Sequence, residues 1–205
     1  MTPIVYPSML HLNGNLMAAV DLETTGVRPG YHEIVQIAIL PLDADFHPLA
    51  AVKPFYTLMK PQFPKRAEKG AMAKNNLQIN DLLLSAPEPD KVADYLVEWF
   101  ESLRLPIGKS LIPLAHNWAF ESSFLKAWLG ITMVDQIFHA HCRDSMILAS
   151  AINDKAAFAC EDYPFTRVNL NYLCKKLKIE NLNAHDALSD ARAESKLYRT
   201  LLQML

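Results

Sequence analysis

The chain has 205 residues, which is enough for one domain with a sizeable core and too few for two. Hydrophobic residues make up 51% of it and charged residues 20%, an ordinary globular composition that excludes a disordered or fibrous protein. The formal net charge of −2 disfavours a protein that coats nucleic acid through a large basic excess, but it is compatible with a small basic groove.

The first part of the chain is predicted to form three strands. Residues 16–22 are apolar until Asp21, residues 34–40 are a second apolar run rich in β-branched side chains, and residues 55–59 alternate. Segment 26–30, which contains glycine and proline, is typical of a turn. This succession indicates an antiparallel meander.

Helical periodicity begins after these strands. Residues 90–103 carry apolar side chains at spacings of three and four, and residues 118–129 place Phe120, Phe124 and Trp128 on one stripe. The other predicted elements are a buried strand at 111–115 and helices at 145–152, 169–177 and 187–205. Early strands followed by alternating helices and strands predict a single α/β domain, residues 1–205, with a mixed sheet.

Residues 60–74 interrupt this pattern. The prolines at 61 and 64 favour a loop. The segment contains a single acidic residue, Glu68, against the basic residues Lys60, Lys65, Arg66, Lys69 and Lys74. It is therefore the one basic cluster that the sequence offers for contact with phosphates, although loops are polar for generic reasons too.

The cysteines and the N-terminus indicate a soluble cytoplasmic protein. Cys142, Cys160 and Cys174 are an odd number without close-pair spacing, as expected for reduced thiols. His139 and His141 lie near Cys142, but no second ligand pair follows at a zinc-finger spacing. No charged and then apolar leader and no membrane-length apolar run is present, so no contact with a membrane is expected.

The first motif with chemical content is DLETTG, residues 21–26. Residues two apart on a strand point to the same face, so Asp21 and Glu23 project together. Paired carboxylates in an apolar strand repel each other unless cations lie between them, and their oxygen ligands suit Mg²⁺ or Mn²⁺. The alternative is a strand end that reaches solvent.

The second motif is HNWAFESSF, residues 116–124, where a buried strand gives way to a helix. Open α/β sheets commonly bind ligands at this position. Glu121 lies at the margin of the apolar stripe, from which its carboxylate can lean over the sheet edge. The alternative is a first-turn acid that complements the helix dipole.

The third motif is HDALSDA, residues 185–191. Five residues on a helix place side chains about 140° apart, so His185 and Asp190 converge only if the histidine precedes the helix. A histidine can accept a proton near neutral pH. The alternative is a capping region in which Asp186 is the N-cap and His185 is exposed.

Taken together, these motifs resemble the DEDDh 3′–5′ exonucleases, the superfamily of proofreading exonuclease subunits, ribonuclease T and oligoribonuclease. Residues 21–26, 117–124 and 185–191 carry the resemblance, with Arg143-Asp144-Ser145 leading into a helix as a further match. The resemblance covers most of the chain. It implies a ribonuclease H-like fold with a mixed five-stranded sheet flanked by helices.

The resemblance also implies roles. Asp21 would bridge two Mg²⁺ ions, Glu23 and Asp190 would complete the first metal site, and Glu121 would hold the second ion. His185 would take a proton from the attacking water, and the product would be a nucleoside 5′-monophosphate. Such a two-metal arrangement stabilises the attacking and the leaving oxygen.

Position 121 departs from the family, which normally has Asp there. The longer glutamate would reach a metal only by another rotamer or a shifted helix. Mg²⁺ demands near-ideal octahedral geometry, and Mn²⁺ sites share its oxygen ligands. We therefore expect activity with a preference for Mn²⁺.

Single-stranded DNA or RNA is the expected substrate, and a homodimer is one expectation because several members of the family pair. Substrate contacts are assigned to Thr24, Thr25, Asn117, Lys65, Arg66 and Lys69. Two other functions stay open: a catalytically silent nucleic-acid-binding or partner-docking module on the same fold, and an unrelated metal-dependent phosphohydrolase.

Overall fold

The computed structural model describes residues 10–11 and 14–205. The single domain expected over residues 1–205, and the interpretation of the N-terminus, include residues 1–9 and 12–13, which lie outside the described part. None of the described helices is long and apolar enough to cross a membrane.

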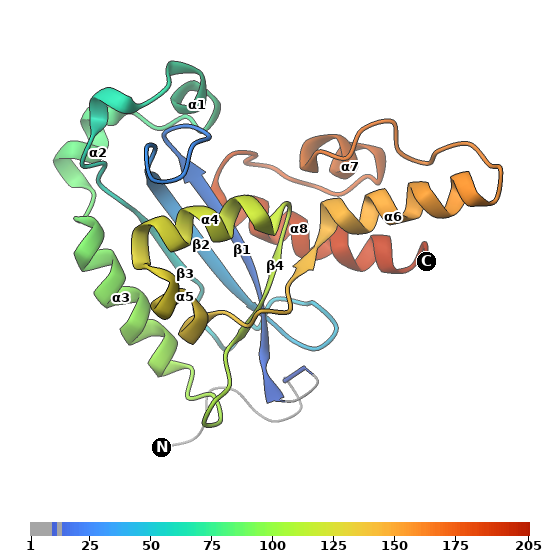
Figure 1. Cartoon of the computed structure of the whole chain (residues 1–205), viewed down its shortest axis with the longest axis horizontal. Coiled ribbons are helices and arrows are strands. Elements are labelled where there is room, and N and C mark those ends of the chain that lie inside the picture. Colours follow the sequence, from blue (N-terminus) through green and yellow to red (C-terminus); the bar gives the residue numbers. More distant parts are fainter. Residues whose placement is uncertain (1–9, 12–13) are drawn as a thin grey trace.

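A five-stranded mixed sheet forms the centre of the molecule, in the order β3-β2-β1-β4-β5 (Figure 1). The strands are β1 (Leu16–Thr24), β2 (Ile34–Leu42), β3 (Phe55–Leu58), β4 (Leu111–Ala115) and β5 (Arg143–Asp144). β2 runs antiparallel to β1 and β3, whereas β4 is parallel to β1 and β5 to β4. The predicted meander and mixed five-stranded sheet are confirmed.

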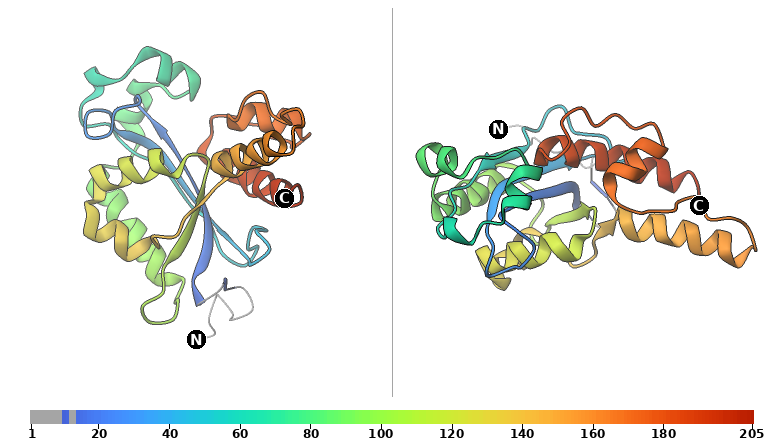
Figure 2. Two further views of the ribbon diagram at one scale, coloured as in Figure 1. Left: turned by 45° about the vertical axis from the view of Figure 1, so that its right-hand side comes forward. Right: turned by 90° about the horizontal axis from the view of Figure 1, so that it is seen from above.

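Helices cover both faces of this sheet. They are α1 (Lys69–Lys74), α2 (Ile79–Ser85), α3 (Pro89–Ser102), α4 (Trp118–Leu129), α5 (Ile131–Ile137), α6 (Ser145–Phe158), α7 (Leu170–Lys176) and α8 (Ala187–Leu202). In the left view of Figure 2, α3, α4 and α5 lie on one side of the strands and α6, α7 and α8 on the other.

The alternation of side chains along β1 divides the core between these two layers. Leu16, Ala18 and Val20 belong to the cluster that contains buried residues of α3, α4 and α5. Met17 and Ala19 belong to the cluster that contains the buried face of α8. By the same alternation, the residues two and four positions after Ala19 face α8, and these positions are occupied by acids.

The segment predicted as a loop, residues 60–74, is partly helical, so that prediction was wrong. It contains the 3-10 turn η3 (Pro64–Arg66) and the short helix α1, seen at the top of Figure 1. Pro64 is tolerated because it occupies the first helical position, where no backbone N–H is needed. The helices α2 and α5 and the two-residue strand β5 are additions to the predicted elements.

Candidate active site

The two acids of the first motif lie near the end of β1, within the strand. Asp21 pairs in register with Ala38 and Glu23 with Gln36, and buried Leu22 points to the opposite face. Both acids are only partly exposed. They therefore do not form a strand end that reaches solvent, and they face the N-terminal end of α8.

The beginning of α8 is fastened to the sheet by a set of polar contacts. Asp186 is the N-cap, and its Oδ1 accepts the backbone N–H of Ser189 at 3.0 Å. Its Oδ2 accepts the hydroxyl of Tyr56, on β3, at 2.5 Å and the amide of Gln36, on β2, at 3.3 Å. Gln36 Oε1 in turn accepts the backbone N–H of Ala187 at 2.9 Å. These bonds fix Asp186, the residue just before the helix, and the first residue of α8.

His185 directly precedes this N-cap, as expected for a histidine that lies before the helix. Its backbone is left-handed, with φ +69°, and its N–H donates to Asp190 Oδ2 at 3.1 Å. Asn181 Nδ2 donates to the other oxygen of Asp190 at 2.5 Å. Asp190 lies in the first turn of α8 and is buried, so both partners hold its carboxylate in place. The capping reading of Asp186 is confirmed, but His185 is only partly exposed.

The structure brings three of the sequence-identified residues into one group. Glu23, His185 and Asp190 each offer a ligand atom, and these atoms lie within 4.8 Å of one another. Two carboxylates and an imidazole on opposing elements are a suitable donor set for a divalent cation. Asp21 and Glu121 lie outside this trio: the charges of Glu23 and Asp190 act on Asp21, and so does the charge of Glu121.

Glu121 occupies the first turn of α4, yet it is only 5% exposed, so it is not a solvent-facing helix acid. Its Oε2 has no hydrogen-bond partner among the described residues. A buried carboxylate oxygen without a partner is costly and is reconciled by a proton or a cation. The site therefore fits a bound cation at the position predicted from the sequence.

The start of α4 is organised by Asp144, at the end of β5. Its carboxylate accepts the backbone N–H of Trp118 at 2.8 Å and that of Asn117 at 3.3 Å. It also accepts the N–H of Met146 at 2.9 Å and of Ile147 at 3.1 Å, at the start of α6. One buried carboxylate thus caps two helices, which explains why an acid follows Arg143 in the sequence.

The acids shift one another's protonation. Burial raises the pKa of Asp21 well above its usual value, and the charges of Asp190, Glu23, Glu121 and Glu194 raise it further. Burial and then Asp190 raise the pKa of Glu23 to about 8. Burial also raises the pKa of Glu121 and of Asp190. A group of carboxylates with raised pKa values is favourable ground for divalent cations, which replace the missing positive charge.

The pKa of His185 shifts the other way. Burial and then the charge of Lys74 lower it, and Asp190 opposes them. The imidazole is therefore neutral at pH 7 and has a nitrogen able to accept a proton. Asn171 Nδ2 lies 3.3 Å from its Nε2.

The residues assigned to substrate contact occupy different settings. Thr24 and Thr25 are buried, and their hydroxyls are used inside the loop: Thr24 Oγ1 donates to the carbonyl of Gly26 at 2.7 Å, and Thr25 Oγ1 accepts the N–H of Glu33 at 2.9 Å. Asn117 begins α4 in a left-handed conformation, φ +85°. Both threonine hydroxyls thus have partners within the protein, and the assignment of these three residues to substrate contact stays a prediction.

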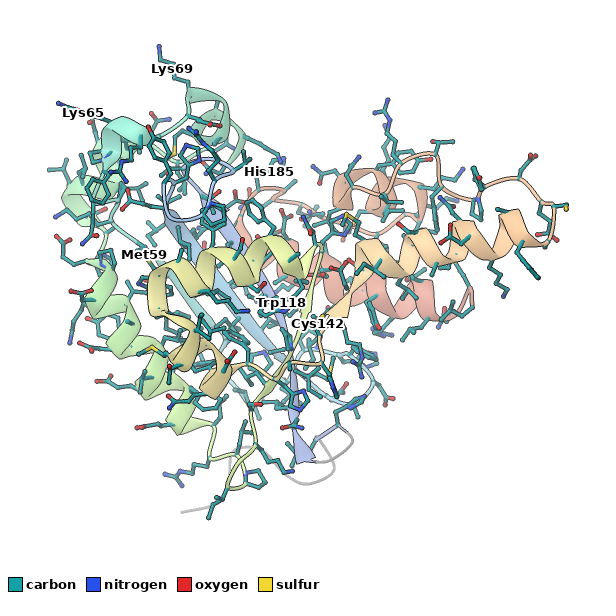
Figure 3. All side chains as sticks on the ribbon, in the orientation of Figure 1. Met59, Lys65, Lys69, Trp118, Cys142 and His185 are labelled. Atoms are coloured by element: carbon teal, nitrogen blue, oxygen red, sulfur yellow. The ribbon has the colours of Figure 1, made fainter. Side chains whose placement is uncertain are left out.

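The basic residues are more scattered than the sequence suggested. Lys65 and Lys69 are exposed and extend outward at the top of Figure 3, away from the labelled His185. The guanidinium of Arg66 stacks on Phe63, 3.9 Å from the ring centroid, and lies 5.0 Å from the centroid of Tyr31. Among the described contacts of these three residues, only Arg66 stacks on aromatic rings.

Three residues close to the acids were not among the predicted site residues. Lys74, predicted only as a member of the basic segment, acts on the pKa of both Glu23 and His185, so its charge reaches the site. Asn181 binds Asp190 directly. Glu194 is buried beside Glu121 and Asp190. Its position was available in the sequence, because residues four apart on a helix share a face and Glu194 follows Asp190 at that spacing.

Sheet order, helical layers and acids gathered at the end of β1 together define a ribonuclease H-like nuclease fold. The chain belongs to the exonuclease family, since the family model described as "Exonuclease" matches residues 18–198. The motifs, which resemble those of the DEDDh 3′–5′ exonucleases, predicted an exonuclease, and the family match confirms it.

Two relatives illustrate the range of this family. The 3′–5′ DNA exonuclease Cap18 of Escherichia coli is 24% identical over 187 residues, which are 91% of each chain. The PolC-type DNA polymerase III of Staphylococcus aureus is 23% identical, with 99% of this chain matching only 12% of the polymerase. The chain therefore corresponds to a small part of that second protein.

Solved structures share the fold. Exonuclease I of E. coli in complex with a dT13 oligonucleotide superposes with a TM-score of 0.69 and 20% identity, over 91% of this chain and 40% of that one. The nuclease domain of 3′hExo, a DEDDh family member bound to rAMP, gives a TM-score of 0.65 and 16% identity over 94% of both chains. A zinc-bound complex of E. coli Exonuclease I with single-stranded DNA gives a TM-score of 0.68 and 18% identity, over 91% of this chain and 40% of that one.

Proposed function

We propose that the protein removes nucleotides from the 3′ end of single-stranded DNA or RNA and releases nucleoside 5′-monophosphates. The observation that carries this proposal is the convergence of Glu23, His185 and Asp190 within 4.8 Å. Asp21 borders this group, and Glu121 in turn lies near Asp21. Membership of the exonuclease family supports the reaction, and these five residues are the proposed catalytic and metal-binding groups.

Asp21, Glu23, Glu121 and Asp190 are the residues that would hold two divalent cations, Mg²⁺ or Mn²⁺. The oxygen-rich donor set and the unpartnered Oε2 of buried Glu121 support this assignment. When bound, such ions supply a nucleophilic water at neutral pH and neutralise charge on the leaving oxygen. The greater length of glutamate at position 121 is the reason to expect a preference for Mn²⁺.

His185 would act as the general base. Its lowered pKa keeps the ring neutral at pH 7, and its ring lies beside the carboxylates of Glu23 and Asp190. A ring nitrogen can therefore take the proton of a water held among these groups. The hydrogen bond from the His185 backbone N–H to Asp190 holds the base and the acid next to each other.

The strand would continue beyond the acids over an aromatic cavity of about 210 Å³ that Tyr31, Phe63, Arg66 and Trp128 help to line. None of the site acids lines this cavity, so it is separate from the reaction centre. Tyr31 and Phe63 are 43% and 48% exposed. Exposed rings beside a guanidinium are the features that bind unpaired bases.

A digestion time course tests the function. Matched DNA and RNA oligomers, single- and double-stranded and labelled at the 5′ end, are incubated with Mg²⁺ or Mn²⁺. We expect a ladder that shortens from the 3′ end, fastest on single strands. Binding without degradation under any condition would favour the silent module, and hydrolysis of small phosphoesters alone would favour a phosphohydrolase.

Replacing Lys65, Arg66 and Lys69 together by neutral residues tests the basic segment. If these side chains neutralise phosphates, the salt dependence of oligonucleotide binding becomes shallower by about one unit of slope for each lost contact. An unchanged slope would show that the segment is an ordinary solvated surface. Lys74→Gln is the matched single change next to the acids, and we expect it to lower the slope on its own.

A further inference from the structure

Glu194 is a buried acid that the four-acid motif does not include. It lies on α8, on the same face as Asp190, and is only 1% exposed. Its Oε1 accepts the hydroxyl of Ser145 at 3.2 Å, whereas its Oε2 has no hydrogen-bond partner in the described part of the chain. No salt bridge between described residues includes it. A carboxylate in this position is costly unless positive charge is brought to it.

Glu121 presents the same problem from the opposite side of the site. It lies on α4, is 5% exposed, and its Oε2 likewise has no hydrogen-bond partner within residues 10–11 and 14–205. The charges of Glu121, Asp144 and Asp190 all act on Glu194. Glu121 and Glu194 both act on Asp21. Two buried carboxylates from two helices therefore act on the same strand acid and on each other, and each has an oxygen without a hydrogen-bond partner among the described residues.

The orientation of Glu194 is fixed by neighbours that leave one oxygen free. Ser145 donates its hydroxyl to Oε1 and lies 2.8 Å from Nδ1 of His116. Ser145 is fully buried, so this arrangement is protected from solvent. Hydrogen bonds of this kind typically orient carboxylates that bind metals.

We propose that Glu194 is a fifth acidic ligand of the metal centre and shares with Glu121 the cation at the second position. This inference rests on the proposed metal-dependent function and adds a ligand to it. It also gives a reason for glutamate at position 121, because two glutamate side chains, one from α4 and one from α8, can bind one ion between them. Mn²⁺ or Mg²⁺ fits such an oxygen-only pair.

Calorimetric titration of Mn²⁺ into the whole chain, without nucleic acid, tests the inference. We expect two ions to bind the wild type. In Glu194→Gln the weaker ion should bind at least about tenfold less tightly, a loss of the size seen when groups around a metal are removed. Glu98→Gln changes an exposed acid on α3 and serves as the control, with no expected effect.

A double-mutant cycle identifies the shared ion. If Glu121 and Glu194 hold the same cation, the variant that carries Glu121→Gln and Glu194→Gln loses little more affinity than either single variant. Additive losses would place the two residues at different ions and would overturn the sharing. Thermal unfolding in EDTA checks that each variant folds, and we expect Glu194→Gln to unfold no earlier than the wild type, since repulsion is removed.

The outcomes separate this inference from the function. Two ions bound with unchanged affinity by Glu194→Gln would overturn the fifth ligand and leave the exonuclease proposal intact, making Glu194 a buried protonated acid. A wild-type chain that binds no Mn²⁺ would overturn both. If Glu194→Gln fails to fold, Glu194→Asp is titrated instead. Because aspartate is one methylene shorter, wild-type affinity for Mn²⁺ in that variant would contradict direct binding of the ion by Glu194.

Discussion

The site acids give the metal-free protein an unusual dependence of stability on pH. The pKa of Glu23 is raised from 4.5 to about 8, first by burial and then by Asp190, with Lys74 opposing. Between these values the folded chain keeps a proton that the unfolded chain releases. The folded chain then holds more protons, so its stability falls as the pH rises, by about 1.4 kcal/mol per pH unit for each such group.

The expected size of this effect follows from the pH range between the two pKa values of Glu23, 4.5 and about 8. From pH 5 to pH 7 a fully buried group would cost about 3 kcal/mol, and screening at partly exposed Glu23 reduces this to about 2 kcal/mol. For a chain of this size that corresponds to a fall in Tm of about 4–8 °C. Asp21, Glu121 and Glu194 act in the same direction, because their pKa values are raised as well.

Thermal unfolding in EDTA at pH 5, 6 and 7 measures the slope, with Glu23→Gln as the matched control. The control is needed because burial lowers the pKa of His116 and of His185. The folded chain then holds fewer protons at these histidines, so their contribution rises with pH up to about 6.5 and opposes that of the acids. Parallel slopes for the wild type and Glu23→Gln would refute the reasoning. Mn²⁺ at a hundred times its Kd should restore about 2.7 kcal/mol to the wild type at pH 7.

Three other substitutions test separate parts of the account. Glu121→Asp should shift the ratio of exonuclease rates toward Mg²⁺, and identical metal preferences in the wild type and the variant would remove the idea. Asp144→Ala removes the cap of both α4 and α6 and should lower the free energy of unfolding by about 2–3 kcal/mol in urea, whereas a loss of less than about 0.5 kcal/mol would contradict the double cap. Gly26→Ala places a Cβ 2.4 Å from the ring of His32 and should cost about 1–3 kcal/mol, an effect that must shrink in a His32→Ala background if the clash is its cause.

Much of the fold could be predicted because long elements carry a clear period. The nine-residue strands β1 and β2 are buried along most of their length, and α3 has an apolar stripe, so periodicity identifies all three. β5 has two residues and α1 has six, too few for a period to register. α4 ends at Gly130, which has a φ of +79°, and α5 begins directly after it. Because glycine is typical of a helix end and α5 has only seven residues, the sequence predicted the first helix and not the second.

The candidate site was predictable for residues that are close in the sequence and lie on the same strand or at the start of the same helix. Asp21 and Glu23 share a strand face, and His185 precedes the helix that carries Asp190, so local rules place each pair. Glu121 and Glu194 come from helices far apart in the chain, and only the packing of both against the sheet makes them neighbours. The spacing of four from Asp190 places Glu194 on the same face of α8, but a glutamate is rarely buried, so its burial beside Glu121 is learned only from the tertiary structure.

The central claim is that these acids form the metal-dependent centre of a 3′–5′ exonuclease. The most direct test is the rate of release of the 3′-terminal nucleotide from a single-stranded oligomer, measured in Mn²⁺ for the wild type and for Asp190→Asn. We expect the wild type to be inactive in EDTA and Asp190→Asn to be slower by at least about a hundredfold with its fold retained. A folded Asp190→Asn variant that digests at the wild-type rate, or digestion that continues in EDTA, would contradict the claim.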